Sequence, residues 1–547
     1  MDTQKLFLLI VFSLSVYLLV EAWQREKSPA PPGATQQTGK TQQAAPTPGE
    51  KLIEKSQVVA APQAGGLQSG EKISVKTDYL LAEVDTLGGD LRRLELLKHR
   101  DTLDKSKNLV LLQSVPDHVY VAQSGLIGPD LPNHKTRFSA ESTSYELKPG
   151  ADRVTVRLNA PEIAGVKVAK IYTFHKSSYV IDVAYEISNG GTQLIQPFSY
   201  FQFLRDGNSP AGETMLVPTY TGPAIYTEQE KFEKIEFSSL DKGKAKYPKN
   251  TDNGWIAILQ HYFLAAWLPK DKTPREYYAR KLDDMLYSVG VILPAGTIEP
   301  GKTASISVPL YAGPQEQDAL SKLAPGLGLT VDYGWLTVIA LPLFWVLSWL
   351  HKWAQNWGVA IILLTVIIKL LFYPLSATSY RSMAKMRVLA PKLQKIKEQY
   401  GDDRQRLHQA MMELYKAEKI NPLGGCLPIV VQIPVFIALY WVLLASVELR
   451  HAPFALWIQD LSTPDPYFVL PIVMGITMII QTYMSPAPPD PIQARVMKIM
   501  PVAMSVFFFF FPAGLVLYWL VNNVLSIAQQ WQINRAIEQA KPAHGKR

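Results

Sequence analysis

The sequence predicts a multi-domain chain in which a polytopic, all-α membrane core of six spans is joined to a large exported all-β sandwich. Two patterns predict this division. Long apolar runs stand at the N-terminus and again from about residue 335, whereas residues 73–325 alternate apolar and polar side chains. A third observation constrains both parts. The 547 residues include one cysteine, Cys426, which excludes an intrachain disulfide and a cysteine-rich metal site.

The first apolar run, residues 6–20, follows Lys5 and fits two interpretations. It suits the apolar region of a signal peptide, for which residues 20–22 give a weak cleavage site. It also suits an uncleaved signal anchor over residues 1–24, because Trp23 extends it to the roughly 17 residues that a span needs. We favour the anchor, and both interpretations export the chain that follows.

Two segments of different composition come next. Residues 25–70 are rich in Pro, Gln, Ala, Thr and Gly, which predicts a disordered linker because such a segment buries little apolar surface. Residues 71–330 carry short alternating runs, such as RVTVRL at 153–158 and YVIDVAYEI at 179–187, with Gly- and Asn-rich turn signals between them. These runs predict an antiparallel β sandwich that is stable without a disulfide.

The remaining spans fall in a predicted core of residues 354–535. Residues 358–375, 427–447 and 467–484 are mostly apolar and of spanning length. Residues 496–531 are too long for one span and are interrupted by the helix-breaking sequence FPAG. We expect two spans there, joined by a tight turn on the outer side.

Residues 335–350 fit two interpretations. Their length and apolar character suit another span, whereas Pro342 and the regularly spaced tryptophans suit a helix that lies in the membrane interface. The choice decides on which side of the membrane each later loop lies. We expect an interfacial amphipathic helix over residues 331–353.

The distribution of lysine and arginine supports that choice. The loop of residues 378–422 and the tail of residues 536–547 are basic, whereas the loop of residues 448–466 carries Arg450 alone. Basic loops face the cytoplasm. The sequence therefore predicts that both termini and the 378–422 loop are cytoplasmic, and that the β domain lies outside.

The 378–422 loop has apolar residues every three or four positions on both sides of Asp402 and Asp403, which predicts an antiparallel helical hairpin with an aspartate cap. Pro391 should kink or restart its first helix. The basic surface fits either a self-packed hairpin with a solvated face or a docking arm for an RNA-rich or acidic partner. The docking residues would be Arg381, Lys385, Arg387, Lys392 and Lys395.

Lys369 stands inside the apolar run of residues 358–375, where a charged amine costs about 3 kcal/mol. No acidic residue lies in the interior of a predicted span. One explanation is snorkelling, because Ser376 at the cytoplasmic end lies about 10 Å further along a helix. The other is a hydrated groove open to the cytoplasm, which polar residues of neighbouring spans favour. These include Thr365, Gln432, Asn522, Asn523 and Ser526.

A second set of residues in the spans is apolar and includes two adaptable methionines. Ordinary packing or lipid contact explains such residues when they stand alone. Beside a polar groove, the same residues could let an apolar helix slide out into lipid. The set consists of Phe436, Met474, Met478 and Phe507.

Four stretches of the predicted core together resemble a known protein family. They are NPLGGCLPIVVQIPVFIALYW (421–441), APFALWIQDLS (452–462), DPYFVLPIVMGITM (465–478) and FPAGLVLYWLVNNVLSIAQQ (511–530). They closely resemble the YidC membrane insertases, which are kin to the Oxa-type and Albino-type proteins of organelles. The resemblance covers residues 335–535, and the N-terminal anchor, linker and β domain resemble the Gram-negative form more loosely.

The resemblance implies a membrane protein insertase and folding chaperone of the bacterial inner membrane, and not an enzyme. Such proteins act on nascent membrane proteins, alone or beside the Sec translocon, and use no nucleotide or metal cofactor. The ribosome or signal recognition machinery would contact the cytoplasmic loops and tail, and membrane lipids would surround the core.

The family's groove positions fall on residues of this chain. Its single basic residue, often arginine, falls on Lys369, which keeps the charge but lacks the planar fork of donors. Its other groove positions fall on Thr365, Gln432 and Trp519. Its apolar slide falls on the Phe and Met set given above.

The resemblance also implies that the β domain is similar to a mutarotase-type supersandwich. His175 and His261 are nevertheless more simply ordinary strand residues, and no catalytic His and Glu set stands out. Two rival functions stay open. A solute transporter would need an intramembrane acid or inverted repeats, and an exported binding domain on a membrane scaffold would need a ligand for the β domain.

Overall fold

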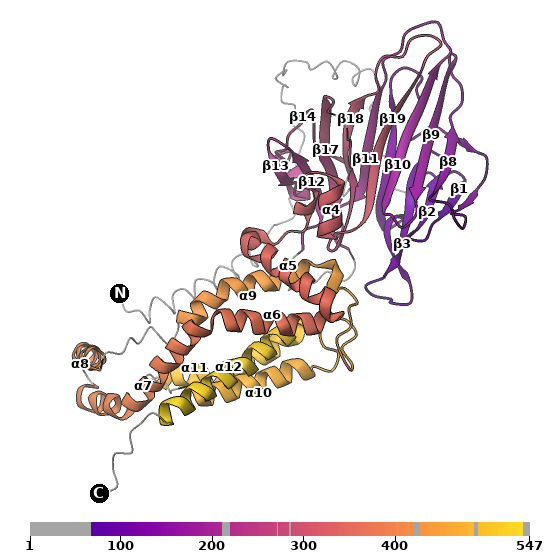
Figure 1. Ribbon diagram of the computed structural model, residues 1–547. Coiled ribbons are helices and arrows are strands. Elements are labelled where there is room, and N and C mark those ends of the chain that lie inside the picture. Colours follow the sequence, from indigo (N-terminus) through magenta and orange to yellow (C-terminus); the bar gives the residue numbers. More distant parts are fainter. Residues whose placement is uncertain are drawn as a thin grey trace. The chain divides into compact units, whose positions relative to one another are not determined.

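The computed structural model describes residues 67–210, 219–270, 272–283, 286–401, 403–418, 427–485 and 491–539 (Figure 1). The predicted anchor of residues 1–24, most of the predicted linker, Cys426 and most of the basic tail lie outside the described residues. The described chain consists of a β domain followed by a helical core, as the sequence predicts.

Two large sheets make up the β domain. One has ten strands in the order β14-β17-β18-β11-β5-β4-β3-β2-β1-β7, and the other has nine in the order β13-β12-β15-β16-β19-β10-β9-β8-β6. The first contains β1 (Lys72–Lys76), β2 (Leu80–Asp85), β3 (Asp90–Arg100), β4 (Asn108–Val115), β5 (His118–Ile127), β7 (Ser144–Glu146), β11 (Phe198–Asp206), β14 (Asn250–Thr251), β17 (Arg275–Asp283) and β18 (Leu286–Pro294). The second contains β6 (Ser139–Ala140), β8 (Arg153–Asn159), β9 (Val166–His175), β10 (Val180–Asn189), β12 (Gly222–Thr227), β13 (Lys231–Lys234), β15 (Trp255–Leu259), β16 (Phe263–Trp267) and β19 (Thr303–Pro314). A short helix, α3 (Phe237–Asp241), joins β13 to β14.

Alternating burial accounts for the sheets. Along β10, every second side chain is buried, and its neighbours β9 and β19 pair with it antiparallel. Trp267 lies between the sheets against Phe201 and Phe203, with ring centroids 5.1 and 5.8 Å from its own. Each large apolar side chain buried in this way contributes about 1.5–3 kcal/mol. The predicted β sandwich is confirmed.

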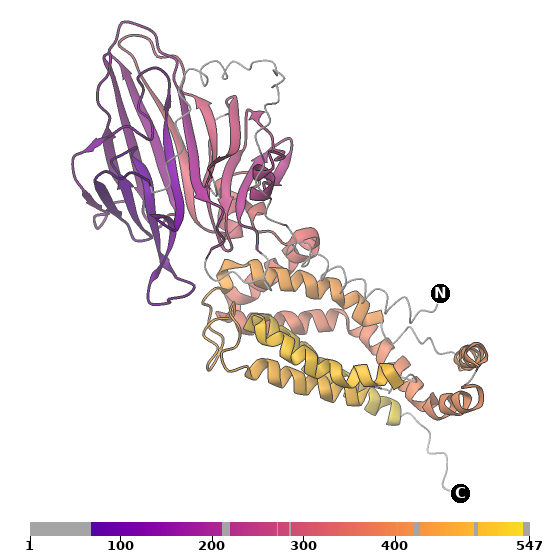
Figure 2. The ribbon, with the colours of Figure 1, turned by 180° about the vertical axis from the view of Figure 1, so that it is seen from behind.

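The helical core begins after β19. Its elements are α4 (Gln317–Leu323), η1 (Leu327–Thr330), η2 (Gly334–Leu336), α5 (Thr337–Ala354), α6 (Trp357–Leu371), α7 (Tyr373–Tyr400), α8 (Arg404–Ala417), α9 (Leu427–Ala445), η4 (Val447–Leu449), α10 (Val469–Met484), α11 (Pro491–Phe507), η5 (Phe508–Phe510) and α12 (Ala513–Gln539). The helix α12 packs against α10 and α6, and lies beside them in both views (Figures 1 and 2).

The predicted break in the last apolar run is present. The helix α11 gives way to the short η5, Phe511 is extended, and α12 begins after Pro512. Another break was not predicted. The helix α6 ends at Leu371, four residues before the expected end at 375, and α7 starts at Tyr373 at an angle of 66°. Pro374 in the first turn of α7 fits this break, because proline is tolerated where a helix starts.

Pro391 was predicted to kink or restart the first helix of the hairpin, and of these two alternatives the restart is absent. The helix α7 runs without interruption through this proline to Tyr400. A proline inside a helix loses one backbone hydrogen bond. That loss is offset where α7 packs against α8, since Leu389 and Tyr415 are both buried. The predicted aspartate cap is correct, because Asp403 accepts hydrogen bonds from the backbone amides of Gln405 and Arg406.

By length and composition, one described helix could cross a membrane alone, namely α5. The helix α6 and the first part of α7 would qualify together, but they are bent by 66°. Two shorter apolar stretches are Val431–Ala445 within α9 and Val469–Met484, the whole of α10.

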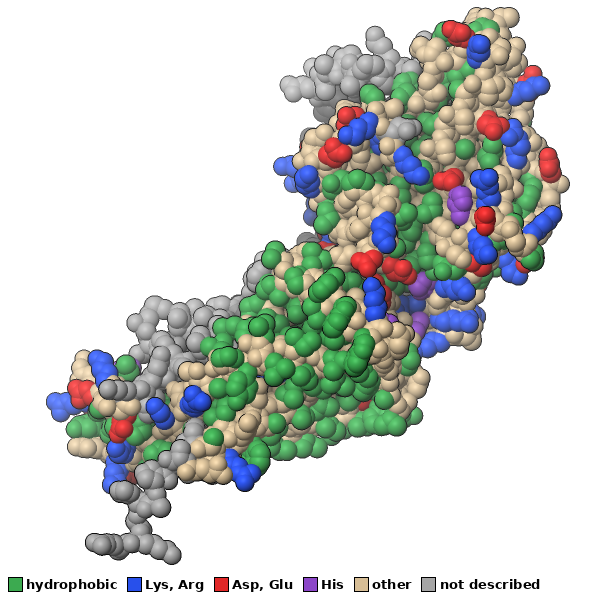
Figure 3. Space-filling model, viewed as in Figure 1, with side chains coloured by type: hydrophobic (Ala, Val, Ile, Leu, Met, Phe, Trp, Pro, Cys, Tyr) green, Lys and Arg blue, Asp and Glu red, His purple; other side chains and the backbone are tan. Residues whose placement is uncertain are grey.

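The helix α5 has two unlike faces. Its exposed face carries Val338, Trp345, Trp349 and Trp353, and three of these are at least 70% exposed. Its other face buries Ala340, Phe344, Leu347 and Leu350, and the helix packs against α6 and α9. Hydrophobic side chains also gather over the neighbouring helices, whereas charged side chains are scattered over the β domain (Figure 3). A wide apolar surface of this kind is typical of a lipid-facing core.

Candidate functional site

Lys369 lies in the last turn of α6 and is almost completely buried, with 4% of its surface exposed. Asn356 caps the start of this helix by accepting a hydrogen bond from the amide of Val359. The Nζ of Lys369 donates a hydrogen bond to Oγ of Ser526 on α12 at 2.7 Å. The two residues are 157 positions apart in the chain, so this contact joins two distant predicted spans.

The Ser526 hydroxyl is oriented to accept from an ammonium. It donates its own hydrogen to the backbone carbonyl of Asn522, one turn earlier on α12, at 2.7 Å. Its oxygen is therefore free to accept from Lys369. The hydroxyl of Tyr380 on α7 interacts with the same serine. Among the described residues, no acidic side chain forms an ion pair with Lys369.

The other predicted groove residues are placed differently. Thr365 is buried and donates to the carbonyl of Ile361 in its own helix at 2.7 Å. Asn523 donates to Oγ1 of Thr477 on α10 at 3.3 Å, and not to Lys369. Gln432 is partly buried on α9. Only Lys369 of this set makes the contact with Ser526.

Trp519 connects the groove set to the apolar set. Its ring meets that of Phe436 edge to face, with centroids 4.4 Å apart. Its indole Nε1 is buried and has no hydrogen-bond partner within the described part of the chain. A buried donor of this kind normally bonds to protein or to water.

The apolar set is spread over three helices. Phe436 and Met478 are partly buried, Met474 is completely buried, and Phe507 is 48% exposed. Phe507 contacts Phe511, with ring centroids 4.7 Å apart. The structure therefore brings Phe436 against Trp519 of α12, leaves Phe507 at the surface, and puts Met474 inside the core.

Four of the five docking residues are exposed on α7, namely Arg381, Lys385, Lys392 and Lys395. The side chain of Arg387 lies outside the described part. Lys392 forms an ion pair with Glu418 at 2.7 Å, across the hairpin of α7 and α8. Lys385 and Lys395 are exposed on the same helix.

The sequence indicated Ser526 as one of the polar residues that favour a groove, but its contact with Lys369 was not predicted, and Tyr380 and Thr477 were not assigned to the site. Helical spacing supports the place of Ser526. Asn523, Ser526 and Gln530 are three and four positions apart and share one face of α12, and all three are buried. Gln530 donates to the carbonyl of Met484 at 3.1 Å, so this polar face also ties α12 to α10.

Two buried aspartates organise the loop between α9 and α10. Asp460 accepts hydrogen bonds from the side chains of His451 and Ser462 at 2.8 and 2.7 Å. Asp465 accepts from the indole of Trp457 at 3.0 Å and from the amide of Leu470 at 2.7 Å. The second bond satisfies a free amide in the first turn of α10.

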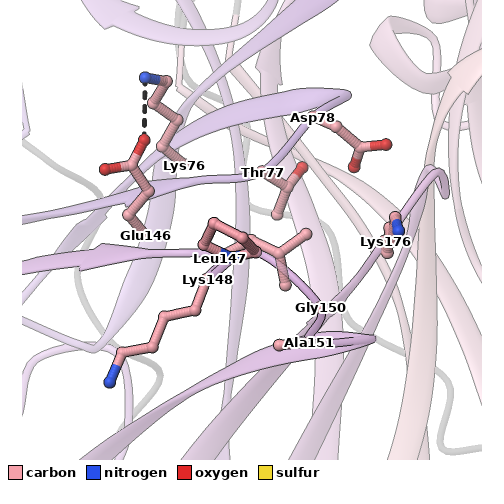
Figure 4. Close-up of a pocket in the computed structure, with 10 residues that line it drawn as sticks. Lys76, Thr77, Asp78, Glu146, Leu147, Lys148, Gly150, Ala151 and Lys176 are labelled. Atoms are coloured by element: carbon pink, nitrogen blue, oxygen red, sulfur yellow. Dashed lines mark ion pairs between the residues drawn. The ribbon is translucent and has the colours of Figure 1, made fainter.

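The β domain has a pocket of its own, about 350 Å³ in volume, next to the turn between β1 and β2 (Figure 4). Lys76 and Glu146 at its rim form an ion pair of 3.0 Å, and Asp78 accepts from the Ser177 hydroxyl at 2.7 Å. Lys76, Glu146 and Asp78 therefore have partners within the domain. The histidines also have ordinary partners, since His175 bonds to Asp182 and His261 to the carbonyl of Leu444. His261 lies in the turn between β15 and β16, so its predicted strand position is wrong.

Comparisons with known proteins cover nearly the whole chain. The family model described as YidC periplasmic domain matches residues 72–346, and the one described as 60Kd inner membrane protein matches residues 349–541. The chain is 62% identical to the membrane protein insertase YidC of Nitrosospira multiformis, over 98% of each protein. It is 58% identical to that of Methylobacillus flagellatus, over 99% of this chain and 98% of the relative.

A solved structure of an active YidC insertase, with its first transmembrane domain resolved, is also similar. It covers 87% of this chain and 96% of its own, at 18% identity and a TM-score of 0.40.

Proposed function

The chain belongs to the YidC family of membrane protein insertases, inner-membrane proteins with a periplasmic domain, and we propose that it works through a hydrated, positively charged groove. The groove moves short polar segments of nascent membrane proteins across the membrane and releases their helices into lipid, alone or with the Sec translocon. The observation that supports this most strongly is the contact of Lys369 with a neutral hydroxyl instead of a carboxylate.

The energetic problem is the dry interior of the membrane. A polar group without a hydrogen-bond partner costs several kcal/mol there. A groove that carries water part of the way shortens the dry path. An ammonium with two further N–H groups can also attract an acidic or polar segment as it enters. No bond is made or broken in this process.

We propose Lys369, Thr365, Gln432, Trp519 and Asn523 as the groove. The unpartnered indole Nε1 of Trp519 supports the presence of water, because water would satisfy it. Asn523 would then act by holding α12 against α10. Phe436, Met474, Met478 and Phe507 form the proposed slide, in which Met474 supports the path from inside the core.

The proposed partners follow from exposed surfaces. The basic face of α7 suits the ribosome or signal recognition machinery, and the exposed tryptophans of α5 suit the lipid interface. In this arrangement both termini are cytoplasmic. We propose an anchor at residues 1–24, a linker at 25–70, a periplasmic domain at 71–330, an interfacial helix at 331–353, and an insertase core at 354–535 that includes hairpin 378–422 and is followed by the basic tail.

The test is insertion by the purified protein in vesicles without Sec components. The substrate is a single-span protein with a short acidic tail, and its translocation is read by protease protection. Lys369→Glu should lower insertion about tenfold or more, since like charges repel, while Lys369→Arg should stay near wild type. If the Lys369→Glu variant inserted the substrate as well as wild type does, the positive charge would have no role in the mechanism.

A further inference from the structure

We propose that Ser526 is a positioning residue of the groove: it holds the Lys369 ammonium on α12 between substrates and yields it to an incoming acidic or polar group. The inference rests on the insertase function proposed above. The proposed function requires a positive charge in the groove but does not say what holds the Lys369 ammonium in place.

A lysine needs such a residue more than an arginine does. Its flexible stem of four carbons lets a compact ammonium take many positions, whereas the guanidinium is planar and larger. Without a partner, the Lys369 side chain could turn toward the cytoplasmic interface. In the structure it instead reaches from α6 to α12 and is almost completely enclosed.

The acceptor itself is fixed in direction. The bond from Ser526 to the carbonyl of Asn522 restricts rotation of the hydroxyl and leaves the lone pairs of its oxygen directed away from that carbonyl. The surrounding helix is held in place as well. Asn523 bonds to Thr477 one turn before the contact, and Gln530 bonds to Met484 one turn after it, so α12 is attached to α10 on both sides.

The Ser526 hydroxyl is also a partner that a substrate can displace from Lys369. A neutral oxygen holds an ammonium less firmly than a carboxylate does. Lys369 uses one of its three N–H donors on Ser526. A substrate carboxylate can therefore bind to the remaining donors first and then displace the serine, so the charge is never left without an acceptor.

The experiment is a double-mutant cycle in reconstituted vesicles, with two single-span substrates that differ only in an acidic or a neutral tail. Ser526→Ala should lower insertion of the acidic-tailed substrate about tenfold and that of the neutral-tailed substrate less than about twofold. Ser526→Thr, which keeps the hydroxyl, should restore the wild-type ratio. In a Lys369→Ala background, Ser526→Ala should have no further effect.

Ser505→Ala is the matched control. Ser505 also donates to a backbone carbonyl in the core, that of Pro471 at 2.8 Å, and within the described part of the chain it has no hydrogen bond to Lys369. It should leave the ratio of the two substrates unchanged. Three results for Ser526→Ala would overturn the inference. They are an equal loss of insertion for both substrates, no loss for either substrate, and the same loss of insertion with and without Lys369. A wild-type protein that inserted neither substrate would instead contradict the proposed function.

Discussion

Trp519 of α12 and Phe436 of α9 meet edge to face, with ring centroids 4.4 Å apart and an interplanar angle of 81°. This pair joins the proposed groove to the proposed slide. A substrate helix that leaves the groove toward lipid would pass these rings. Their contact contributes about 1 kcal/mol beyond its buried area, as aromatic pairs do.

Phe436→Ala should therefore weaken the release of substrates whose span is only weakly apolar. We expect insertion of such a substrate to fall about fivefold, and that of a strongly apolar one to change little. Protease protection in vesicles measures both. Ile433→Ala is the matched control, because Ile433 is on the same helix and 46% exposed. An equal loss in the two variants would argue against a special role for Phe436.

The basic face of α7 should bind the ribosome through charge. Lys385→Glu combined with Lys395→Glu should weaken binding of ribosome–nascent-chain complexes about tenfold at low salt, and less at high salt, because salt screens exposed charges. Co-sedimentation with vesicles measures the affinity.

The ion pair across the hairpin supplies the control. Glu418→Gln breaks the pair with Lys392 but keeps the basic face, and an exposed pair contributes at most about 1 kcal/mol. Its binding should match wild type, and circular dichroism should show unchanged helix content in all variants. If the double-glutamate protein bound ribosomes normally at low salt, the docking role of the hairpin would be lost.

Glu448 should make stability depend on pH. It lies in η4, after the end of α9, where burial raises the pKa of its carboxyl from 4.5 to about 7, with smaller contributions from Glu316 and Asp318. The folded state holds this proton more tightly than the unfolded chain. The free energy of unfolding should therefore fall as pH rises from about 4.5 to about 7, and level off above that.

Glu448→Gln removes the ionisable carboxyl and should therefore remove this fall in the free energy of unfolding with pH. We expect it to raise the free energy of unfolding by on the order of 2 kcal/mol at pH 8 and to leave it unchanged at pH 4.5. Thermal unfolding in detergent, followed by circular dichroism, measures the difference. Glu413→Gln on the exposed face of α8 is the control. Parallel pH curves for wild type and Glu448→Gln would refute the assignment.

Local patterns predicted much of the fold. The alternation along residues 179–187 depends only on neighbouring positions, and β10 buries the expected face. The FPAG break was also predicted, because proline and glycine close together disfavour continuation of a helix. The restart at Pro391 is absent because packing of α7 against α8 offsets the intrinsic cost of the proline, and that packing depends on residues outside α7.

The candidate site was also predictable only where it depends on the local sequence. An isolated charge in an apolar run identifies Lys369 from the sequence alone. Ser526 was noted among the polar residues of the spans, but its contact with Lys369 was not predicted because the two residues are 157 positions apart. The roles of Asp460 and Asp465 in the loop between α9 and α10 were not predicted, since they depend on how the loop folds back on itself.

The central claim is that water reaches the Lys369 ammonium. It is tested most directly by a nitroxide at position 522, introduced as Asn522→Cys in a Cys426→Ser background, which keeps both Lys369 and Ser526. Position 522 is partly buried and one helical turn from the contact. The account predicts that a water-soluble nickel relaxant reaches this label more readily than molecular oxygen does. Preferential relaxation by oxygen, as for a label in lipid, would contradict it.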